Sequence, residues 1–265
     1  MRAIFFLPLL VILGSCTSKK GTYEASGTFQ LAPPLFAVDS ALFKNAATFT
    51  LQFGFPESQI RYTLDGKDVD GHSAMYTAPI QLKHSATLKA KAFHPDFRAS
   101  DQVSLPIEKL VHDISKATVT LTPPPHDNYK GSGAQGLVDM QKGGLQFSGS
   151  NAWMGFQGNP ITITIDLNNE LELSFVKVST LQNQGGWIFA PQKIEVLSGT
   201  QEIGKITIES AEEQQDNQLA MIAVPLKKGT YSQLTLQVYP LDEIPQWHQG
   251  KGTAPWLFMD EILVE

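Results

Sequence analysis

Two glycine-rich stretches of the sequence carry aromatic and polar side chains of the kind that bind sugars. The first reads LQNQGGW and contains Asn183 and Trp187, and the second reads PQWHQGKG and contains Trp247 and His248. An indole ring can cover the apolar face of a pyranose, while polar groups bond its hydroxyls. Glycine in a loop leaves room for a ligand to approach. We therefore take these four residues as candidate ligand-binding residues, with packing in the core as the alternative for Trp187.

The sequence contains no pattern that predicts catalysis. No suitably spaced acid or nucleophile accompanies His248, so we do not expect it to act as a general base. Asp65, Asp68 and Asp70 are closely spaced. The glutamate that closes an EF-hand calcium loop is absent, so we interpret them as solvated turn acids. We expect His72, His84 and His94 on the surface, because they are scattered without the spacing of metal ligands.

Composition excludes several classes of protein. The chain has 265 residues, of which 42% are hydrophobic and 17% charged, so it can bury a core in one large or two ordinary domains. Its net charge is −6 and it has no Lys/Arg run, which excludes nucleic acid as a partner. A single cysteine excludes an internal disulfide and cysteine-rich zinc sites. The chain also lacks the bulk of a typical (β/α)₈ hydrolase, whose barrel alone needs about 250 residues.

Period-2 alternation of apolar residues predicts that strands position these loops. It occurs over residues 48–55, 88–92, 161–167 and 234–238, with turns expected at Asp65-Gly66 and Lys228-Gly229. Residues 107–114 have helical spacing for barely two turns, and we interpret them as a strand end and a linker. The run of three prolines at 123–125 follows closely, so we place a domain boundary near residue 112. The expected fold class is all-β.

Residues 27–111 resemble the small β-sandwich appended to bacterial chitobiases, β-hexosaminidases and some α-fucosidases. The matching residues include Tyr62 to Gly66, then Tyr76, Pro79 and Ile80, and then a Lys/Ala-rich strand, with Val69 where that family often has proline. The resemblance implies a small Ig/fibronectin-like β-sandwich that serves as a structural spacer or accessory module.

Residues 112–265 resemble a factor 5/8 type C (discoidin) domain, a galactose-binding-like jelly-roll β-sandwich that often binds carbohydrate. The copies that it resembles most follow the spacer in family-20 β-hexosaminidases. The blocks that carry the resemblance begin at Gly136, Trp153, Ile165, Trp187 and Trp256. The resemblance also implies a structural calcium ion, because Asp139 and Glu261 match an early and a late ligand of that fold. Met140 and Gly144 depart from the usual glycine and hydroxyl residue, and a turn-capping Asp139 with a solvent-facing Glu261 is the alternative. On a strand, Asp260 and Glu261 would point to opposite faces.

The N-terminus resembles that of a bacterial lipoprotein. Residues 1–15 contain Arg2 and an apolar run of about ten residues, too short to cross a ~30 Å hydrocarbon core but suited to a signal peptide. Leu13, Gly14, Ser15 and Cys16 then resemble a lipobox. The resemblance implies cleavage before Cys16 and lipidation of its sulfur, followed by a tether over residues 16–26. The expected location is the cell envelope, lipid-anchored to the outer membrane.

The most favoured interpretation is a non-catalytic envelope lipoprotein whose discoidin-type module binds a glycan and is displayed on a spacer sandwich. Both modules are appendages of the enzymes they resemble, so we do not expect an enzyme. Two alternatives stay open. One is a protein-interaction or assembly module without a sugar site, and the other is a glycoside hydrolase of an unrecognised type.

Overall fold

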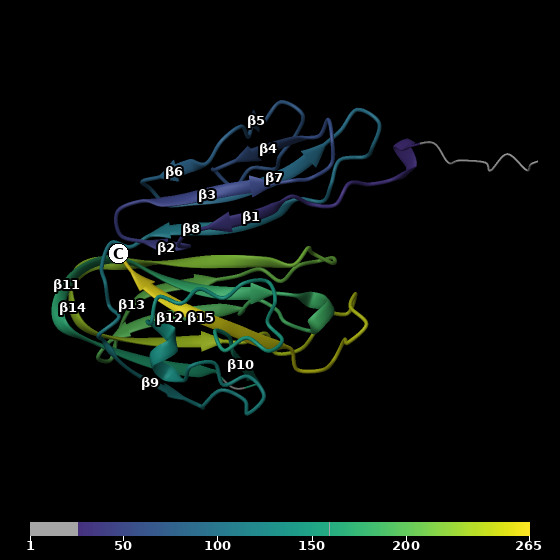
Figure 1. The fold of residues 1–265 in the computed structure, drawn as a ribbon. Coiled ribbons are helices and arrows are strands. Elements are labelled where there is room, and N and C mark those ends of the chain that lie inside the picture. Colours follow the sequence, from purple (N-terminus) through teal and green to yellow (C-terminus); the bar gives the residue numbers. More distant parts are fainter. Residues whose placement is uncertain (1–25, 159) are drawn as a thin grey trace, which may run out of the picture.

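The computed structural model describes residues 26–158 and 160–265, which form two β-sandwiches (Figure 1). The predicted signal peptide and Cys16 lie outside the described residues. The all-β prediction, with a jelly roll as the second sandwich, is confirmed. The first sandwich contains η1 (Ser26–Thr28), β1 (Leu35–Val38), β2 (Leu42–Phe43), β3 (Ala47–Gln52), β4 (Gln59–Thr63), β5 (Ala74–Met75), β6 (Ile80–Leu82), β7 (Ala86–Phe93) and β8 (Val103–Lys109). The second contains β9 (Thr118–Thr122), η2 (Ala134–Leu137), β10 (Met154–Gln157), β11 (Ile161–Gln182), η3 (Gln184–Gly186), β12 (Lys193–Ser198), β13 (Gln201–Thr207), β14 (Gln218–Tyr239) and β15 (Trp256–Val264).

The first sandwich packs a three-stranded sheet, β1-β3-β6, against a five-stranded sheet, β2-β8-β7-β4-β5. The alternation in β7 buries Leu88, Ala90 and Ala92 to 1% exposure or less, as the sequence predicted. Phe49 on β3 lies in the same core, with Tyr62 edge-on at 6.0 Å between ring centroids. Gly66 has φ 76° at the predicted Asp65-Gly66 turn, which a glycine adopts without strain.

Two very long strands build both layers of the second sandwich. β11 and β14 each contain 22 residues and pair antiparallel along most of their length, with register shifts between Asp166 and Leu171 and between Leu173 and Phe175. The first half of β11 pairs with β9, and its second half pairs with β15. The strands therefore bend from one layer into the other, at the end of the molecule where the C-terminus lies (Figure 1). The alternating residues in this core, all at most 5% exposed, are Ile161, Ile163, Ile165, Leu167, Leu234, Leu236 and Val238.

Two sequence-based expectations about strand ends were wrong. The strand predicted over residues 48–55 ends at Gln52, and Phe55 is 44% exposed in the following loop. Gly54 and Pro56 explain this, because glycine weakens a strand and proline cannot donate to its ladder. Lys228-Gly229 is no turn between strands, since it lies within β14 where that strand changes layer. A bend inside one long strand and a hairpin turn leave the same glycine signal in sequence.

The two sandwiches pack directly on each other through β8. This strand is buried on both faces, with Ile107 in the core of the first sandwich and Glu108 toward the second. Lys177 Nζ on β11 lies 2.8 Å from Glu108 Oε2 and 2.8 Å from Glu265 Oε1. Two clusters of apolar residues span both sandwiches. One contains Leu42, Leu110 and Leu263, with Met140 and Met221 against them, and a larger one includes Ile107 of the first sandwich and Leu181 and Leu219 of the second. Residues 110–117 connect β8 to β9 and have no regular structure, consistent with their interpretation as a linker.

No helix among residues 26–158 and 160–265 is both long and apolar enough to cross a bilayer.

Candidate functional site

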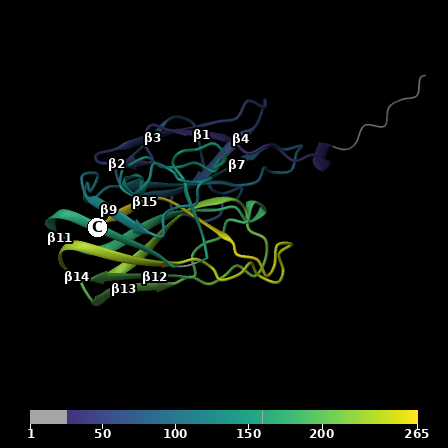
Figure 2. The same ribbon diagram turned by 90° about the horizontal axis from the view of Figure 1, so that it is seen from below.

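The loops that carry the four candidate ligand residues lie together at one end of the second sandwich. Asn183 and Trp187 flank η3 after β11, while Trp247 and His248 lie in the connection from β14 to β15. The two loops touch, because a Cβ added to Gly250 would lie 3.0 Å from Trp187 Cε2. Figure 1 and Figure 2 show η3 and the β14–β15 connection at the end opposite the C-terminus. The fold thus brings together two loops that are about sixty residues apart in the sequence.

Hydrogen bonds fix the conformation of the first loop. Asn183 Oδ1 accepts from the backbone N–H of Gly186 at 2.8 Å, which caps η3. Asn183 and Ile188 exchange backbone hydrogen bonds of 3.0 and 2.9 Å, so the loop closes like a hairpin. Trp187 at its tip adopts φ 63° and is 38% exposed. Left-handed backbone is costly for a bulky residue and is retained where the surrounding structure fixes it. The Asn183 side chain is therefore committed to the loop, whereas the Trp187 ring is available at the surface.

The second loop uses its candidate residues largely for its own structure. Trp247 donates its indole N–H to the carbonyl of Ala211 at 2.8 Å and is half-buried. His248 is 5% exposed, and its Nδ1 accepts from the backbone N–H of Gly250 at 3.0 Å. Both residues still line a shallow pocket together with Gly185. These two side chains hold the loop end in shape and offer a ligand only the part that faces this pocket.

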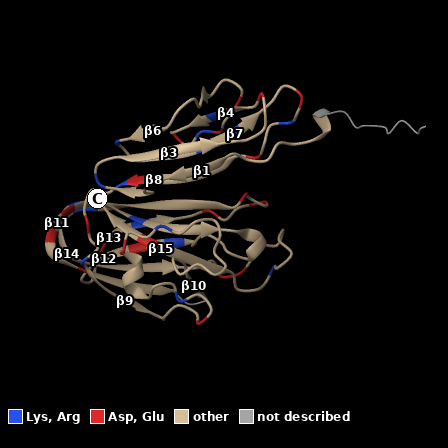
Figure 3. Cartoon of the chain, viewed as in Figure 1, with Lys and Arg blue, Asp and Glu red and all other residues tan. Residues whose placement is uncertain are grey.

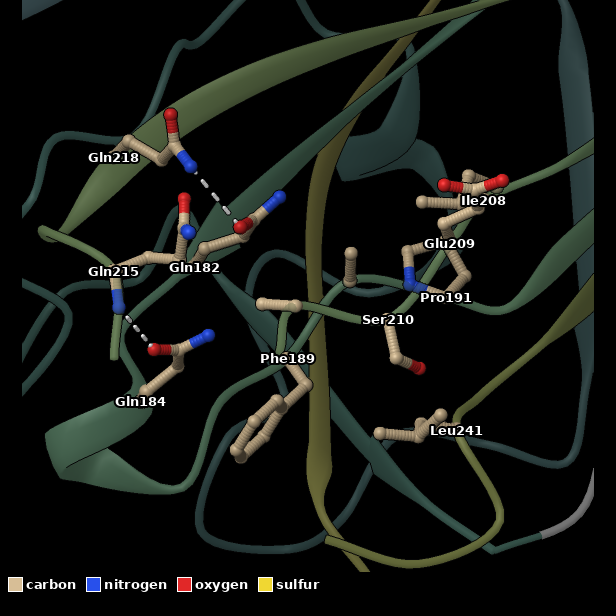
Figure 4. Close-up of a pocket in the computed structure, with 12 residues that line it drawn as sticks. Gln182, Gln184, Phe189, Pro191, Ile208, Glu209, Ser210, Gln215, Gln218 and Leu241 are labelled. Carbon is tan, nitrogen blue, oxygen red and sulfur yellow. Dashed lines mark hydrogen bonds between the residues drawn. The ribbon is translucent and has the colours of Figure 1, made fainter. Parts of the chain in front are cut away.

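A pocket lined by glutamines lies beside these loops, and its residues were not among those predicted from sequence. Its volume is about 270 Å³. Gln182 and Gln184 each accept a hydrogen bond through the amide oxygen, from Gln218 Nε2 at 3.1 Å and from the backbone N–H of Gln215 at 2.6 Å. Figure 4 shows that their amide nitrogens point away from these bonds. The amide nitrogens therefore stay available as donors.

The opposite wall of the glutamine pocket offers acceptors and apolar surface. Glu209 and Ser210 follow β13 and are exposed. Phe189 and Pro191 are buried below them, with Leu241 at the side (Figure 4). A concave site with an apolar wall and a few convergent polar groups is what a small polyol needs. The signal in the sequence was the high density of glutamine over 182–184 and 214–218, which by itself does not indicate a site.

A second candidate site contains Asp139 and Glu261, the two carboxylates that match calcium ligands. Asp139 lies near the start of the jelly roll and Glu261 on its last strand, β15, and the fold brings them close together. Glu261 on β15 is 1% exposed, and neither of its carboxylate oxygens has a hydrogen-bond partner among the residues that the structure describes. Burial, followed by the charges of Asp260 and Asp139, raises the pKa of Glu261 to about 9, against the opposing effects of the Met140 backbone and Lys142. Asp139 Oδ1 accepts from the N–H of Gln141 at 2.8 Å, which caps the turn after η2. The solvent-facing alternative for Glu261 is therefore wrong.

The expectation that Asp260 and Glu261 point to opposite faces was also wrong. β15 contains a bulge, because Ser179 pairs with Glu261 and Thr180 with Met259, which leaves Asp260 without a partner on β11. A bulge interrupts the alternation of side chains. Both carboxyl groups consequently lie against the segment of residues 139–143.

Lys142 neutralises Asp260 inside the second sandwich. Its Nζ lies 3.0 Å from Asp260 Oδ2, and the side chains of Lys142 and Asp260 are 6% and 0% exposed. Asp260 also accepts from the N–H of Gly143 at 2.6 Å, and Lys142 donates to the Ser179 hydroxyl. In Figure 3 acidic and basic segments meet at β15 inside the second sandwich. Asp260 is thus fully occupied, and Glu261 is the carboxylate left without a partner.

The residues around Glu261 fit a divalent cation. An unpartnered, solvent-excluded carboxylate beside a second one is stabilised by a hard cation with oxygen ligands. Within the described residues no three His, Cys, Asp or Glu side chains converge, so backbone carbonyls would complete the shell. Met140 takes φ 65°, the conformation that the usual glycine would adopt freely. The carbonyl of Gly144 accepts from Trp153 Nε1 at 2.9 Å and keeps a second lone pair.

Comparison with known protein families supports the resemblance that the sequence indicated for the first sandwich. Residues 38–104 match the family model described as the chitobiase/beta-hexosaminidase C-terminal domain, which confirms the resemblance stated from the sequence. No curated protein sequence matches the chain.

The solved structures that are similar to this chain each align with a little over half of its length. The C-terminal domain of a chitobiase from Bacteroides fragilis is 16% identical, with 58% of this chain and 95% of that chain covered and a TM-score of 0.36. The family 32 CBM of Clostridium perfringens NanJ, in complex with galactose, is 12% identical, with 57% and 95% covered and a TM-score of 0.33. A Streptococcus pneumoniae fucose binding module is 15% identical, with 58% and 98% covered and a TM-score of 0.39. Residues 38–104 are thus similar to the chitobiase/beta-hexosaminidase C-terminal family, and they precede a jelly roll that carries the glutamine pocket.

Proposed function

We propose that this protein is a non-catalytic saccharide-binding protein of the cell envelope, and that its binding site is the loop end of the jelly roll. The observation that carries the proposal is the glutamine pocket. Two free amide donors, from Gln182 and Gln184, oppose the acceptors Glu209 and Ser210 across an apolar wall. Vicinal hydroxyls of a sugar both donate and accept, so they match a pocket that offers both kinds of group.

The exposed Trp187 and the pocket of Trp247 extend the same surface. The indole N–H of Trp247 reaches Ala211, which also lines the glutamine pocket, so the two hollows are neighbours. A saccharide of more than one unit would contact both. Because shallow polar sites gain little net free energy, we expect weak binding of each sugar unit.

A screen of monosaccharides and glycans against the chain lacking residues 1–16 tests the site. Tryptophan fluorescence reports binding. Gln182→Ala should weaken binding about 5–10-fold, since one buried hydrogen bond to a ligand contributes about 1–1.5 kcal/mol. Gln201→Ala, an exposed glutamine at the start of β13, is the matched control and should bind normally. If no saccharide binds and the chain instead co-purifies with an envelope protein, the assembly alternative replaces this proposal.

A calcium ion held by Asp139, Glu261 and backbone carbonyls is part of the proposal. When bound, it supplies positive charge that clips the first loop of the jelly roll to its last strand. The chain's own contribution is to bury Glu261 without a partner and to occupy Asp260 with Lys142. The cation has a structural role there and takes no part in sugar binding.

The proposed envelope location depends on a lipid attached to Cys16. The acyl chains would hold the protein at the outer membrane through the tether over residues 16–26, because two or more chains anchor stably. We expect the wild-type chain to label with an alkyne fatty acid and to fractionate with membranes. Cys16→Ser should abolish both. A labelled Cys16→Ser chain would remove the anchor from the proposal.

A further inference from the structure

The first sandwich carries an exposed aromatic cluster at one of its ends. Phe55, His94 and Phe97 meet edge-to-face, with ring centroids 5.0 to 5.4 Å apart. Phe55 is 44% exposed, although a phenyl ring of this kind is normally buried. His94 Nδ1 accepts from the N–H of Asp96 at 3.1 Å, which leaves Nε2 as the protonated donor. The cluster presents an apolar ring beside a free imidazole N–H.

A pocket of about 300 Å³ adjoins this cluster and is lined by planar polar side chains. Its polar lining residues are Glu57, Gln59, Arg61 and His94, and Phe93 and Pro95 add apolar surface. Arg61 donates to the Ser73 carbonyl at 2.7 Å and to Gln59 Oε1 at 3.2 Å, both neutral acceptors. Among the residues that the structure describes, no carboxylate forms an ion pair with Arg61. The guanidinium has five donors, so several remain for a ligand.

These groups have the chemistry of a sugar subsite. Arginine, glutamine and glutamate side chains can each engage two adjacent hydroxyls, and the Phe55 ring can take the apolar face of a pyranose. Glu57 adopts φ 58°, a left-handed conformation that holds its side chain at the rim of the pocket. Phe55 takes part in the sandwich's hydrogen bonds through its carbonyl, which accepts from the Ser58 N–H at 3.4 Å, and its ring is left for contacts with other groups.

The aromatic cluster and the loop end of the jelly roll lie at the same end of the molecule. β3 and β7 both run toward the right in Figure 1, and the loops after them follow there. η3 and the β14–β15 connection lie at the right as well, in Figure 1 and after the 90° turn of Figure 2. The C-terminus and the bends of β11 and β14 lie at the other end.

The interface between the sandwiches holds these two sites in a fixed arrangement. The Lys177 ion pairs with Glu108 and Glu265 are 2.8 Å long, and the lysine side chain is 15% exposed. Leu42, Leu110 and Leu263 are each at most 8% exposed in the apolar contact beside them. Two sites fixed on one rigid body convert the second binding event of a long ligand into an intramolecular one.

We propose that the pocket lined by Arg61 and His94, together with the Phe55 ring that packs on His94 beside it, is a second saccharide subsite, and that both sandwiches bind one extended glycan chain at the same end of the molecule. This inference rests on the proposed function of the jelly roll and names its ligand class as a polysaccharide or long oligosaccharide. The first sandwich is then part of the binding surface in addition to being a spacer.

Affinity measured against ligand length tests the inference. The probes are chito- and galacto-oligosaccharides of one to eight units, titrated by calorimetry into the chain lacking residues 1–16. We expect affinity to rise on the order of 10–100-fold beyond the length that spans both sites. Phe55→Ala and Arg61→Gln should each remove that rise and leave the affinity for the monosaccharide unchanged.

Phe175→Ala is the matched control, because Phe175 is 39% exposed and bonds the C-terminal Glu265 at the opposite end. It should keep the full rise. A rise that persists in Phe55→Ala and Arg61→Gln, or binding of monosaccharide without any rise, overturns the second subsite and leaves the proposed function intact. Absence of binding at every length overturns both.

Discussion

Removal of divalent cations should destabilise this protein, and the buried Glu261 sets the size of the effect. Both oxygens of a carboxylate with 1% exposure lack partners, and each unsatisfied buried group costs about 1–3 kcal/mol. A cation that binds only the folded chain, present at about 100 times its Kd, contributes about 2.7 kcal/mol. For a chain of this size each kcal/mol corresponds to about 2–4 °C in Tm. A chelator should therefore lower Tm by about 5–10 °C.

Glu261→Gln separates a bound cation from a merely buried carboxylate. Glutamine has nearly the same shape but brings no charge, so the variant should lose the response of Tm to both chelator and added calcium. In chelator it should be about as stable as the wild type, because the raised pKa of about 9 keeps the metal-free Glu261 protonated at pH 7, so that neither side chain is charged. The assay is differential scanning calorimetry at pH 7 with EDTA and with 1–5 mM calcium, concentrations of the order set by weak protein sites. An unchanged wild-type Tm in EDTA would refute the reasoning, as would a Glu261→Gln chain that still responds.

Two further predictions concern ion pairs. Lys142→Met should lower the free energy of unfolding in urea by about 3–5 kcal/mol, because it leaves Asp260 buried and unpaired. The control Lys44→Met removes an ion pair whose lysine is 59% exposed and should cost under about 1 kcal/mol. Equal costs for the two variants would contradict the buried pair. The Lys193 ammonium is the main cause that lowers the pKa of Glu195 from 4.5 to about 2. A lowered pKa stabilises the fold above the unfolded value, so this contribution should be complete above pH 4.5 and lost as the pH falls toward 2. Glu195→Gln should flatten the loss of stability measured across that window, and an unchanged slope would show that the ion pair does not form in solution.

The four stretches predicted as strands from their alternation each overlap a strand with one buried face, whereas β12, which also buries alternate residues, was not predicted. Ile161, Ile163 and Ile165 alternate because one side of β11 faces the core, and the structure buries all three completely. Phe55 followed the same alternation and is exposed, because a period-2 pattern carries no information about where the sheet ends. Pro56 marked that end in the sequence.

The candidate site was only partly predictable. The glycine-flanked loops of Trp187 and Trp247 were found from sequence, and the structure shows that they touch. The roles of individual side chains depend on three-dimensional contacts that spacing does not encode. His248 lies buried against Gly250, and Gln184 faces a pocket that forms only when residues 208–218 fold beside it. The bulge at Asp260 is also a property of pairing with β11 and could not be read from β15 alone.

The most direct test of the central claim is a titration of the ¹⁵N-labelled chain with galactose and N-acetylglucosamine, followed through side-chain resonances. We predict saturable shifts in the amide NH₂ signals of Gln182 and Gln184 and in the indole signal of Trp187, with the signal of Gln201 unmoved. Shifts confined to other regions, or no shifts at millimolar sugar, would contradict a saccharide site at the loop end of the jelly roll.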